Sequence, residues 1–383
     1  MRARARSRTI LFGVTIDYQL RYHDGLEEKL VNDGWDVHLV SGSGPILDRL
    51  GQAQGVTAHE LAMKRNPSPV ADLVALVKWI RLLRRVRPAV VVVATPKAAL
   101  LGSIAAACTG VPVRIYENLG LRLETAQGLL AKVLLGTERL TNAMSTWMVG
   151  VGRSLADRAV ELGASSREKT IVIGAGSPNG IDVTSFERAS NNESGQRELR
   201  EQLGIGDDSD ILLFVGRITR DKGIDTLGAA LALLAEDREL HLLVVGRVDD
   251  EDGDALVDRL SSSAWNTTFI GEVEDVAPYF SISDVFCFPS RREGLGLVIL
   301  ESFASRVPVV ATRATGVVEL VINDRTGALV EHDPQQFADA VARALDDKGW
   351  RCSVADQAYR LVHDSYRREV VQANWLAFLD EQV

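Results

Sequence analysis

The stretch "REGLGLVILESFA" carries two carboxylates, Glu293 and Glu301, on either side of an almost wholly apolar run. Gly294 and Gly296 let the backbone approach a ligand closely, and a helix is predicted to begin near Leu297. At about 100° and about 1.5 Å per residue, Glu301 lies little more than one turn from the first free amides of that helix. Those amides favour an anion, whereas carboxylates hydrogen-bond to sugar hydroxyls. Both acids can therefore face one ligand that carries sugar and phosphate.

A second charged element, "FVGRITRDKGID", follows a predicted strand. Gly216 lets the chain turn, and Arg217 and Lys222 come after it. The planar donor fork of arginine and the compact charge of lysine together suit a diphosphate. Taken alone, the element with Arg217 and Lys222 also fits a solvated basic loop. The element with the two acids also fits a helix with an acidic first turn, which would explain Glu293 better than Glu301. Together, the two elements predict a nucleotide-sugar site, with one acid on the ribose and the other on the transferred sugar.

Three further charged residues follow predicted strands in the first half of the chain. Lys97 lies in "ATPKAALLG", and Arg122 and Glu124 lie in "YENLGLRLET". Because ligands of parallel sheets bind outside the carboxyl ends of the strands, we expect all three to face an interdomain cleft and to bind an acceptor that carries phosphate. A surface position at a helix start is an equally good interpretation of Lys97. Arg21 and His23 in "DYQLRYHDG" are further acceptor candidates.

Strand-like and helix-like segments alternate along the chain on both sides of a polar stretch. Continuous β-branched runs such as "AVVVVATP" are typical of parallel strands buried on both faces. The alternation predicts an α/β protein with two doubly wound, Rossmann-like parallel-sheet domains that face a cleft. We assign residues 1–186 to an acceptor-binding domain, 187–200 to a linker, 201–354 to a nucleotide-sugar-binding domain and 355–383 to a C-terminal helix. This helix, roughly 355–381, has Trp375 and Phe378 to bury and can cross back onto the first domain.

Length and composition fit two globular domains, since the chain has 383 residues, 46% of them hydrophobic and 25% charged. The net charge of -9 is uneven: residues 1–190 hold 24 Lys and Arg against 17 Asp and Glu, and residues 191–383 hold 19 against 35. A basic half suggests an anionic partner, although two solvated surfaces would give the same numbers. The basic amphipathic run "ALVKWIRLLRRVR", with the arginine-rich start, could lie on an anionic membrane or form an ordinary surface helix.

The sequence lacks the signatures of several other functions. "VIGAGSPNGID" has no third glycine where a dinucleotide-binding turn needs one. There is no HExxH, paired Cys–His or DxD-type cluster, so we expect no metal and no cofactor, and we predict that "DDEDGD" at 249–254 is an exposed loop. The spacing of the three cysteines fits a reduced cytosolic protein. Without a secretory leader or a run of about 18 apolar residues, a cytoplasmic protein is expected, with peripheral contact at the inner face of the cell membrane left open.

The second half of the chain resembles the family 4 retaining glycosyltransferases, which have the GT-B fold. "GRITRDKG" is similar to their GR-x-x-x-x-KG element, and "EGLGLVILE" is similar to their E-x7-E element. In the first half, "TPKAALLG", "VPVRIYENLGLRLETAQG" and "GSPNGID" resemble the bacterial branch that builds capsule, exopolysaccharide and O-antigen units on a lipid carrier. The resemblance covers nearly the whole chain.

The resemblance implies a role for each charged element. Arg217 and Lys222 would hold the donor diphosphate, while Glu301 would take the ribose and Glu293 the transferred sugar. Many relatives carry a histidine at the position of Leu119, so the acceptor contact of that histidine is in doubt here. The implied site comprises the catalytic residues Arg217, Lys222 and Glu293, the donor-binding residues Gly216, Arg217, Lys222, Glu293, Gly294, Leu295, Gly296, Leu297 and Glu301, and the acceptor-binding residues Lys97, Arg122 and Glu124.

The implied activity is that of a metal-independent, retaining hexosyltransferase. It would move a hexose or N-acetylhexosamine from a UDP-sugar to a saccharide on a polyprenyl diphosphate, with no cofactor and no nucleic-acid partner. Two alternatives remain open at this point. A UDP-sugar 2-epimerase of the same fold would need no lipid acceptor, and a non-catalytic partner in a polysaccharide assembly complex would turn over no substrate.

Overall fold

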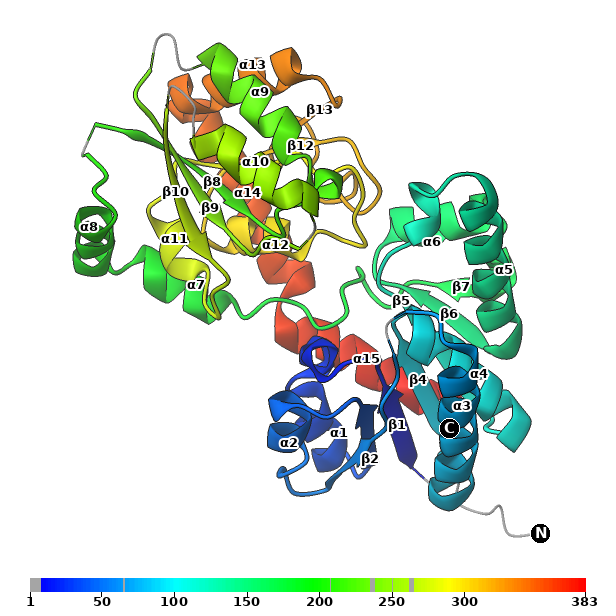
Figure 1. Cartoon of the computed structure of the whole chain (residues 1–383). Helices are drawn as coiled ribbons and strands as arrows, with labels where there is room; N and C mark the ends of the chain where they lie inside the picture. The colour runs from blue at the N-terminus through cyan, green and yellow to red at the C-terminus, as the bar shows by residue number, and fades with distance from the viewer. Residues whose placement is uncertain (1–7, 65, 207, 235–237, 250, 262–264) are drawn as a thin grey trace. The chain divides into compact units, whose positions relative to one another are not determined.

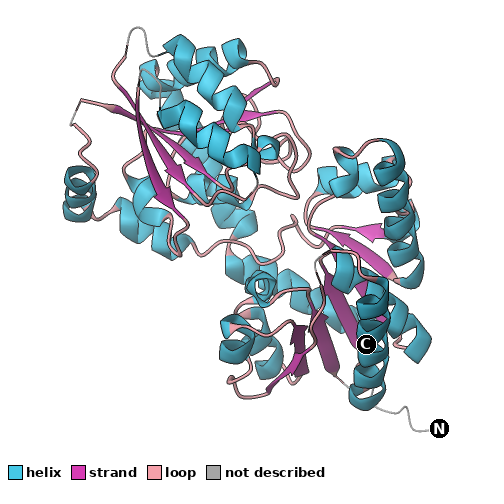
Figure 2. Cartoon of the chain, in the orientation of Figure 1, coloured by secondary structure: helices cyan, strands magenta, loops and turns pink. Residues whose placement is uncertain are grey.

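Strands and helices alternate through the chain, as the sequence predicts (Figure 2). The computed structural model describes residues 8–64, 66–206, 208–234, 238–249, 251–261 and 265–383. The chain divides into two units, one formed by Met1–Asn179 with Glu369–Val383 and the other by Gly180–Arg368. The arginine-rich start lies outside the described residues.

The described residues of the first unit build a seven-stranded parallel sheet in the order β3-β2-β1-β4-β5-β6-β7 (Figure 1). Its strands are β1 Thr9–Gly13, β2 Asp36–Ser41, β3 Val56–Glu60, β4 Val90–Ala94, β5 Val113–Asn118, β6 Trp147–Gly150 and β7 Thr170–Ile171. Its helices are η1 Asp17–His23, α1 Leu26–Asn32, α2 Pro45–Leu50, α3 Pro69–Val86, α4 Pro96–Thr109, η2 Arg122–Glu124, α5 Gly128–Met144, α6 Arg153–Glu161, η3 Arg167–Lys169 and α15 Arg368–Gln382.

The described residues of the second unit build a six-stranded parallel sheet in the order β10-β9-β8-β11-β12-β13. Its strands are β8 Asp210–Val215, β9 Leu240–Val245, β10 Asn266–Gly271, β11 Val285–Phe288, β12 Val309–Thr312 and β13 Ala328–Val330. Its helices are α7 Val183–Ser190, α8 Glu193–Gln202, η4 Arg220–Lys222, α9 Ile224–Leu234, α10 Glu251–Ser261, α11 Ala277–Ser281, α12 Leu297–Ala304, α13 Pro334–Asp346, α14 Lys348–Leu361 and η5 Val362–Tyr366.

Both sheets are doubly wound, as predicted. In the second unit the chain runs outward from β8 to β10 and then returns to the centre of the sheet as β11. In the first unit it runs outward from β1 to β3 and returns as β4. The order of the strands therefore reverses between β8 and β11 and between β1 and β4, and ligands of such sheets bind outside the strand ends at these switch points. None of the helices built by the described residues has the length and hydropathy of a membrane-spanning segment.

The region between the two sheets differs from the predicted linker. Residues 187–190 belong to α7 and residues 193–200 to α8, and the division between the units comes earlier, after Asn179. Asp182 caps α7 by accepting a hydrogen bond from the amide of Thr184, and Asn192 caps α8 in the same way. None of the residues of α8 is buried, so this helix leaves no apolar period in the sequence.

Two other segments also differ from expectation. The last helix, expected over roughly 355–381, is two helices, α14 and α15, with the π turn η5 between them. The break lies beside the point where the chain passes from the second unit to the first. The acidic run 249–254 is only partly loop, because α10 begins at Glu251.

The final helix, α15, completes the core of the first unit. Val371, Trp375 and Leu379 recur every fourth residue, are buried and join the hydrophobic cluster beneath β1 and β4. A spacing of four places the three side chains on one face of a helix. The first unit therefore draws part of its core from the end of the chain.

Replacing Trp375 by alanine should lower the free energy of unfolding of the first unit by about 3–5 kcal/mol, because a fully buried indole leaves a cavity. Urea unfolding of the whole chain measures the change. Glu381→Ala, at an exposed position of the same helix, is the control and should change that free energy by less than about 0.5 kcal/mol. A loss below about 1 kcal/mol in Trp375→Ala would contradict this assignment of the core.

Candidate active site

The predicted donor residues gather where β8 and β11, the two neighbouring strands at the switch point of the second sheet, come to an end. Arg217 follows β8 directly after the glycine turn, and Lys222 ends the short helix η4. Glu293 follows β11. Because both strands are parallel and adjacent, their carboxyl ends bring residues about 70 positions apart in sequence to one edge.

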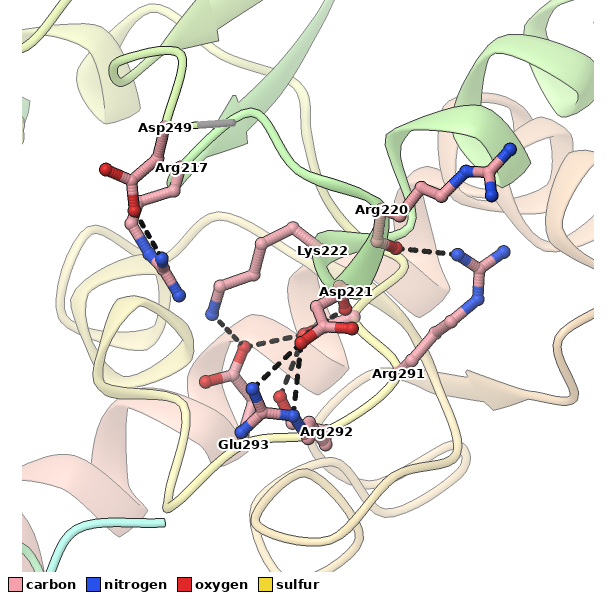
Figure 3. A network of polar contacts seen from close by, with 9 residues as sticks. Arg217, Arg220, Asp221, Lys222, Asp249, Arg291, Arg292 and Glu293 are labelled. Carbon is pink, nitrogen blue, oxygen red and sulfur yellow. Dashed lines mark hydrogen bonds and ion pairs between the residues drawn. The ribbon is translucent and has the colours of Figure 1, made fainter. Parts of the chain in front are cut away.

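Lys222 and Glu293 form the central contact of this edge (Figure 3). Lys222 Nζ donates to Glu293 Oε1 at 2.5 Å, and the side chains are only 18% and 13% exposed. The hydroxyl of Ser290, which is fully buried, donates to the same Oε1 at 2.7 Å. The ammonium group also lies 5.9 Å from the centre of the Phe288 ring. Among the described residues Glu293 Oε2 has no hydrogen-bond donor, so this second carboxylate oxygen can accept one from a ligand.

Three arginine contacts join the loop after β11 to the segment that follows β8, which includes η4 and the start of α9. The backbone amide of Arg291 donates to the carbonyl of Asp221 at 2.9 Å, and its guanidinium donates to Asp225 at 3.0 Å. Arg292 donates to the carboxylate of Asp221 at 2.8 Å. Burial acts to raise the pKa of Asp225, but the hydrogen bond and charge of Arg291 outweigh it and hold that pKa below its ordinary value. These contacts fix the distance between the two loops.

The approach of these loops depends on a glycine. Gly223, directly after Lys222, has φ +70°, and a Cβ built on it would lie 1.9 Å from the carbonyl oxygen of Pro289. No side chain fits at that distance, and the left-handed conformation is itself unfavourable for other residues. Gly223 therefore lets η4 lie against the end of β11.

Arg217 has a partner that the sequence did not point to. Its guanidinium donates to Asp249 Oδ2 at 2.5 Å, and Asp249 follows the next strand, β9 (Figure 3). Arg247 lies 3.5 Å from the same carboxylate. Asp249 was assigned only to an acidic loop, and the signal that could have found it is its position just after a strand next to β8. In this structure an acid therefore lies beside each of the two cations that are expected to hold a diphosphate.

The glycine-rich element after Glu293 leads into α12 as predicted. Gly296 is the N-cap residue, with φ +71°, and the helix begins at Leu297. Among the described residues no side chain caps this helix by a hydrogen bond. The amide of Ile299 donates to the carbonyl of Gly296 at 2.8 Å, so the amides of Leu297 and Val298 are the ones that an anion could use. The amide of Glu293 donates to the carbonyl of Thr315 at 3.1 Å, which holds the element against the loop after β12. Leu295 and Gly296 are buried, whereas Gly294 and Glu301 are partly exposed.

The three predicted acceptor residues lie in the first unit, in different environments. Lys97 Nζ donates to Asp72 Oδ1 and to the carbonyl of Asn66, both at 2.7 Å, so its charge is already engaged. Glu124 lies 3.5 Å from the guanidinium of Arg158. Arg122 is exposed and has no ion-pair partner among the residues that the structure describes. Only Arg122 therefore offers an uncommitted charge to a ligand.

The two further acceptor candidates, Arg21 and His23, contact other residues of η1 and β5. The guanidinium of Arg21 lies over the ring of Tyr18, 4.4 Å from its centre. His23 Nε2 lies 3.0 Å from Glu117 Oε2, and both side chains are buried, so His23 is not a surface contact. Nowhere in the described ranges do three or more His, Cys, Asp or Glu side chains come together as they would around a metal ion.

Two family models match the chain. The model described as Glycosyl transferases group 1 matches residues 209–347, and the Glycosyl transferase 4-like domain matches residues 21–176. The Staphylococcus aureus capsular polysaccharide biosynthesis glycosyltransferase CapM is 31% identical over 371 residues, covering 96% of this chain and 95% of the relative. An Escherichia coli UDP-Gal:alpha-D-GlcNAc-diphosphoundecaprenol alpha-1,3-galactosyltransferase is 26% identical, covering 84% of this chain and 83% of the relative.

Solved structures agree with the predicted GT-B fold. The Anabaena protein Alr3699/HepE, solved with UDP and glucose, superposes with a TM-score of 0.78 at 19% identity and covers 97% of this chain and 99% of its own. A glycosyltransferase from Rickettsia africae superposes with a TM-score of 0.81 at 17% identity, covering 98% of this chain and 99% of its own. At these identities the likeness confirms the fold.

Replacing Gly223 by alanine adds both a steric clash with Pro289 and the strain of a left-handed backbone, and comparison with a second glycine separates these two effects. Gly204, with φ +67° and no atom within 4 Å of a built Cβ, is the matched control. We expect Gly204→Ala to lower the free energy of unfolding of the second unit by about 1 kcal/mol and Gly223→Ala by at least about 3 kcal/mol. Urea unfolding measures both changes. Equal losses would show that the two loops do not need to touch at Gly223.

Proposed function

Because the chain belongs to the family of the group 1 glycosyl transferases, we propose that it transfers a hexose or N-acetylhexosamine from a UDP-sugar to a lipid-linked saccharide in cell-surface polysaccharide synthesis. The capsular role of CapM and the diphosphoundecaprenol-linked substrate named for the Escherichia coli relative support this choice of pathway and acceptor. The UDP and glucose bound in the Anabaena structure support the choice of donor. The observation that carries the proposal is the Lys222–Glu293 pair at the switch point of the second sheet.

When the donor binds, its diphosphate replaces the carboxylate partners of the two cations in this site. Arg217 and Lys222 turn from Asp249 and Glu293 to the diphosphate, and the first amides of α12 complete its coordination. Glu293, released from Lys222, accepts hydrogen bonds from hydroxyls of the transferred sugar. Glu301, inside α12, accepts those of the ribose. Each acid thus meets a neutral hydroxyl group, and each cation meets a phosphate oxygen.

Transfer proceeds with retention and without a metal ion or a cofactor beyond the nucleotide sugar. The bond between the anomeric carbon and the diphosphate oxygen breaks, and the electron pair stays on the diphosphate. The acceptor hydroxyl attacks the anomeric carbon from the same face, and its proton passes to the departing diphosphate. Arg217, Lys222 and the α12 amides stabilise the charge that develops on the leaving group, a task that preorganised donors perform well. No enzymic nucleophile takes part in this scheme.

Acceptor binding involves the first unit. Arg122 is the foremost candidate for the acceptor's diphosphate, because it is exposed and lies between β5 and α5. Lys97 can contribute only by giving up Asp72, and Glu124 can accept a hydrogen bond from a sugar hydroxyl. Leu119 has no polar group with which to replace the histidine found in many relatives.

Incubation with a panel of UDP-sugars, with and without a bacterial lipid extract, tests the activity. We expect labelled sugar to enter the lipid fraction only when donor and extract are both present, with release of UDP. Formation of an epimeric sugar with free UDP in the absence of lipid would indicate a 2-epimerase. No turnover of any donor with any extract would indicate a non-catalytic protein. Either result would contradict the proposal.

Replacing Lys222 or Arg217 by alanine should lower the rate of transfer by about 10² or more, by analogy with the loss of one donor from an oxyanion site. Lys348→Ala removes the same charge from an exposed position at the start of α14 and is the matched control, with an unchanged rate expected. The initial rate of transfer at saturating donor is the measurement. Full activity in Lys222→Ala would contradict the assignment of the diphosphate site.

A further inference from the structure

Helix α5 presents an apolar face to solvent. Leu129, Val133 and Leu140 lie along one side of the helix, and Leu130 lies beside them. Their positions, i, i+4 and i+11, fall on one stripe of an α-helix. Leu129 alone is 78% exposed. Buried neighbours normally cover such a stripe, and its exposure indicates a surface that contacts something outside the unit.

The exposed face of helix α3 has an apolar part and a basic part. Its first half exposes four apolar side chains, and its second half exposes basic ones on the same side. The exposed apolar residues are Val70, Leu73, Val74 and Val77, and the exposed basic residues are Lys78, Arg81, Arg84 and Arg85. Trp79, which the sequence placed in this amphipathic run, points inward and is fully buried, with its indole nitrogen 3.5 Å from the sulfur of Met63.

The two helices lie on the same face of the first sheet. Helix α4 contacts both α3 and α5, and all three belong to consecutive crossovers around β4 and β5 (Figure 1). Right-handed crossovers of this kind place their helices on one face of the sheet, with each helix starting at the carboxyl edge. The apolar first turns of α3 and α5 are therefore at the same end of the sheet, near the strand ends that precede Lys97 and Arg122.

The exposed faces of α3 and α5 also carry no carboxylate. Each helix has a single acidic residue. Asp72 is paired with Lys97, and Glu138 is turned toward the Tyr116 hydroxyl, which donates to it at 3.1 Å. Together with Lys132 on α5, the surface combines exposed aliphatic groups with positive charge alone. This combination matches an anionic bilayer, in which acyl chains receive the apolar groups and headgroups pair with the cations.

We propose that α3 and α5 form a docking surface for an anionic lipid bilayer, the apolar first turns entering the headgroup region and the basic half of α3 lying on it. The inference rests on the proposed function at one point: the lipid-linked acceptor of that function resides in a bilayer. A second copy of the chain fits this surface less well, because a two-fold contact would bring identical cationic ridges together. Docking here holds the carboxyl edge of the first sheet close to the headgroups that carry the acceptor.

Co-sedimentation with vesicles tests the surface, using the whole chain without donor or acceptor. We expect binding to vesicles of phosphatidylglycerol and phosphatidylcholine and little binding to phosphatidylcholine alone. Leu129→Gln with Val133→Gln should lower the partition coefficient at least about tenfold, and Arg81→Gln with Arg84→Gln should lower it by a similar factor. All four positions are on α3 or α5 and outside the site of the second unit.

Matched controls come from the second unit. Leu233→Gln changes a leucine that is 50% exposed on α9, and Arg360→Gln removes an exposed positive charge from α14. Neither should change vesicle binding.

Two results of the vesicle experiment would overturn the inference: unchanged binding in both the α3 and the α5 double variants, or no binding by the unaltered chain. Light scattering gives a further test. If the unaltered chain is a dimer, and the Leu129→Gln, Val133→Gln variant is a monomer that still binds vesicles, the inference is also overturned. Vesicle binding by a protein without transferase activity would refute the proposed function alone.

Discussion

The ion pair between Lys222 and Glu293 is the contact on which the rest of the site depends. It joins the loop after β8 to the loop after β11, and it is mostly removed from solvent. Taking two charges out of water is unfavourable unless further hydrogen bonds compensate, and here the buried hydroxyl of Ser290 supplies one. The close approach that the pair requires exists because Gly223 has no side chain where it meets Pro289.

In this arrangement three cations of the site each lie beside a carboxylate. Lys222 faces Glu293, Arg217 faces Asp249, and Arg292 faces Asp221. In the proposed donor complex, a diphosphate replaces a carboxylate at the first two cations, and the carboxylate released from Lys222 binds a sugar hydroxyl. On this proposal a sugar diphosphate satisfies both partners of the pair, whereas an inorganic anion would satisfy only the cation. The pair would then couple recognition of phosphate to recognition of sugar.

The sequence predicted the parallel strands and the strand ends at which Arg217, Lys222 and Glu293 lie, because buried strands such as β4 and β8 leave continuous apolar runs. It missed β3, whose exposed edge position weakens the pattern, and β13, which has three residues. Ser290 lies only three residues before Glu293 and was missed because a single serine after a strand forms no recognisable motif. Asp249 was missed because it meets Arg217 only through the order of strands in the sheet. The same holds for the contact of Lys97 with Asp72, 25 residues away, which is invisible to local spacing.

The affinity for UDP in a Glu293→Gln variant tests the central claim most directly. Glutamine keeps the size of the side chain and can still accept from Ser290, but as a neutral group it holds Lys222 less strongly than the carboxylate does. The account predicts that UDP, measured by calorimetry, binds about fivefold more tightly, as expected when a competing contact of about 1 kcal/mol is removed, while sugar transfer falls. Unchanged or weaker binding of UDP would contradict the claim that the donor diphosphate takes the place of Glu293 at Lys222.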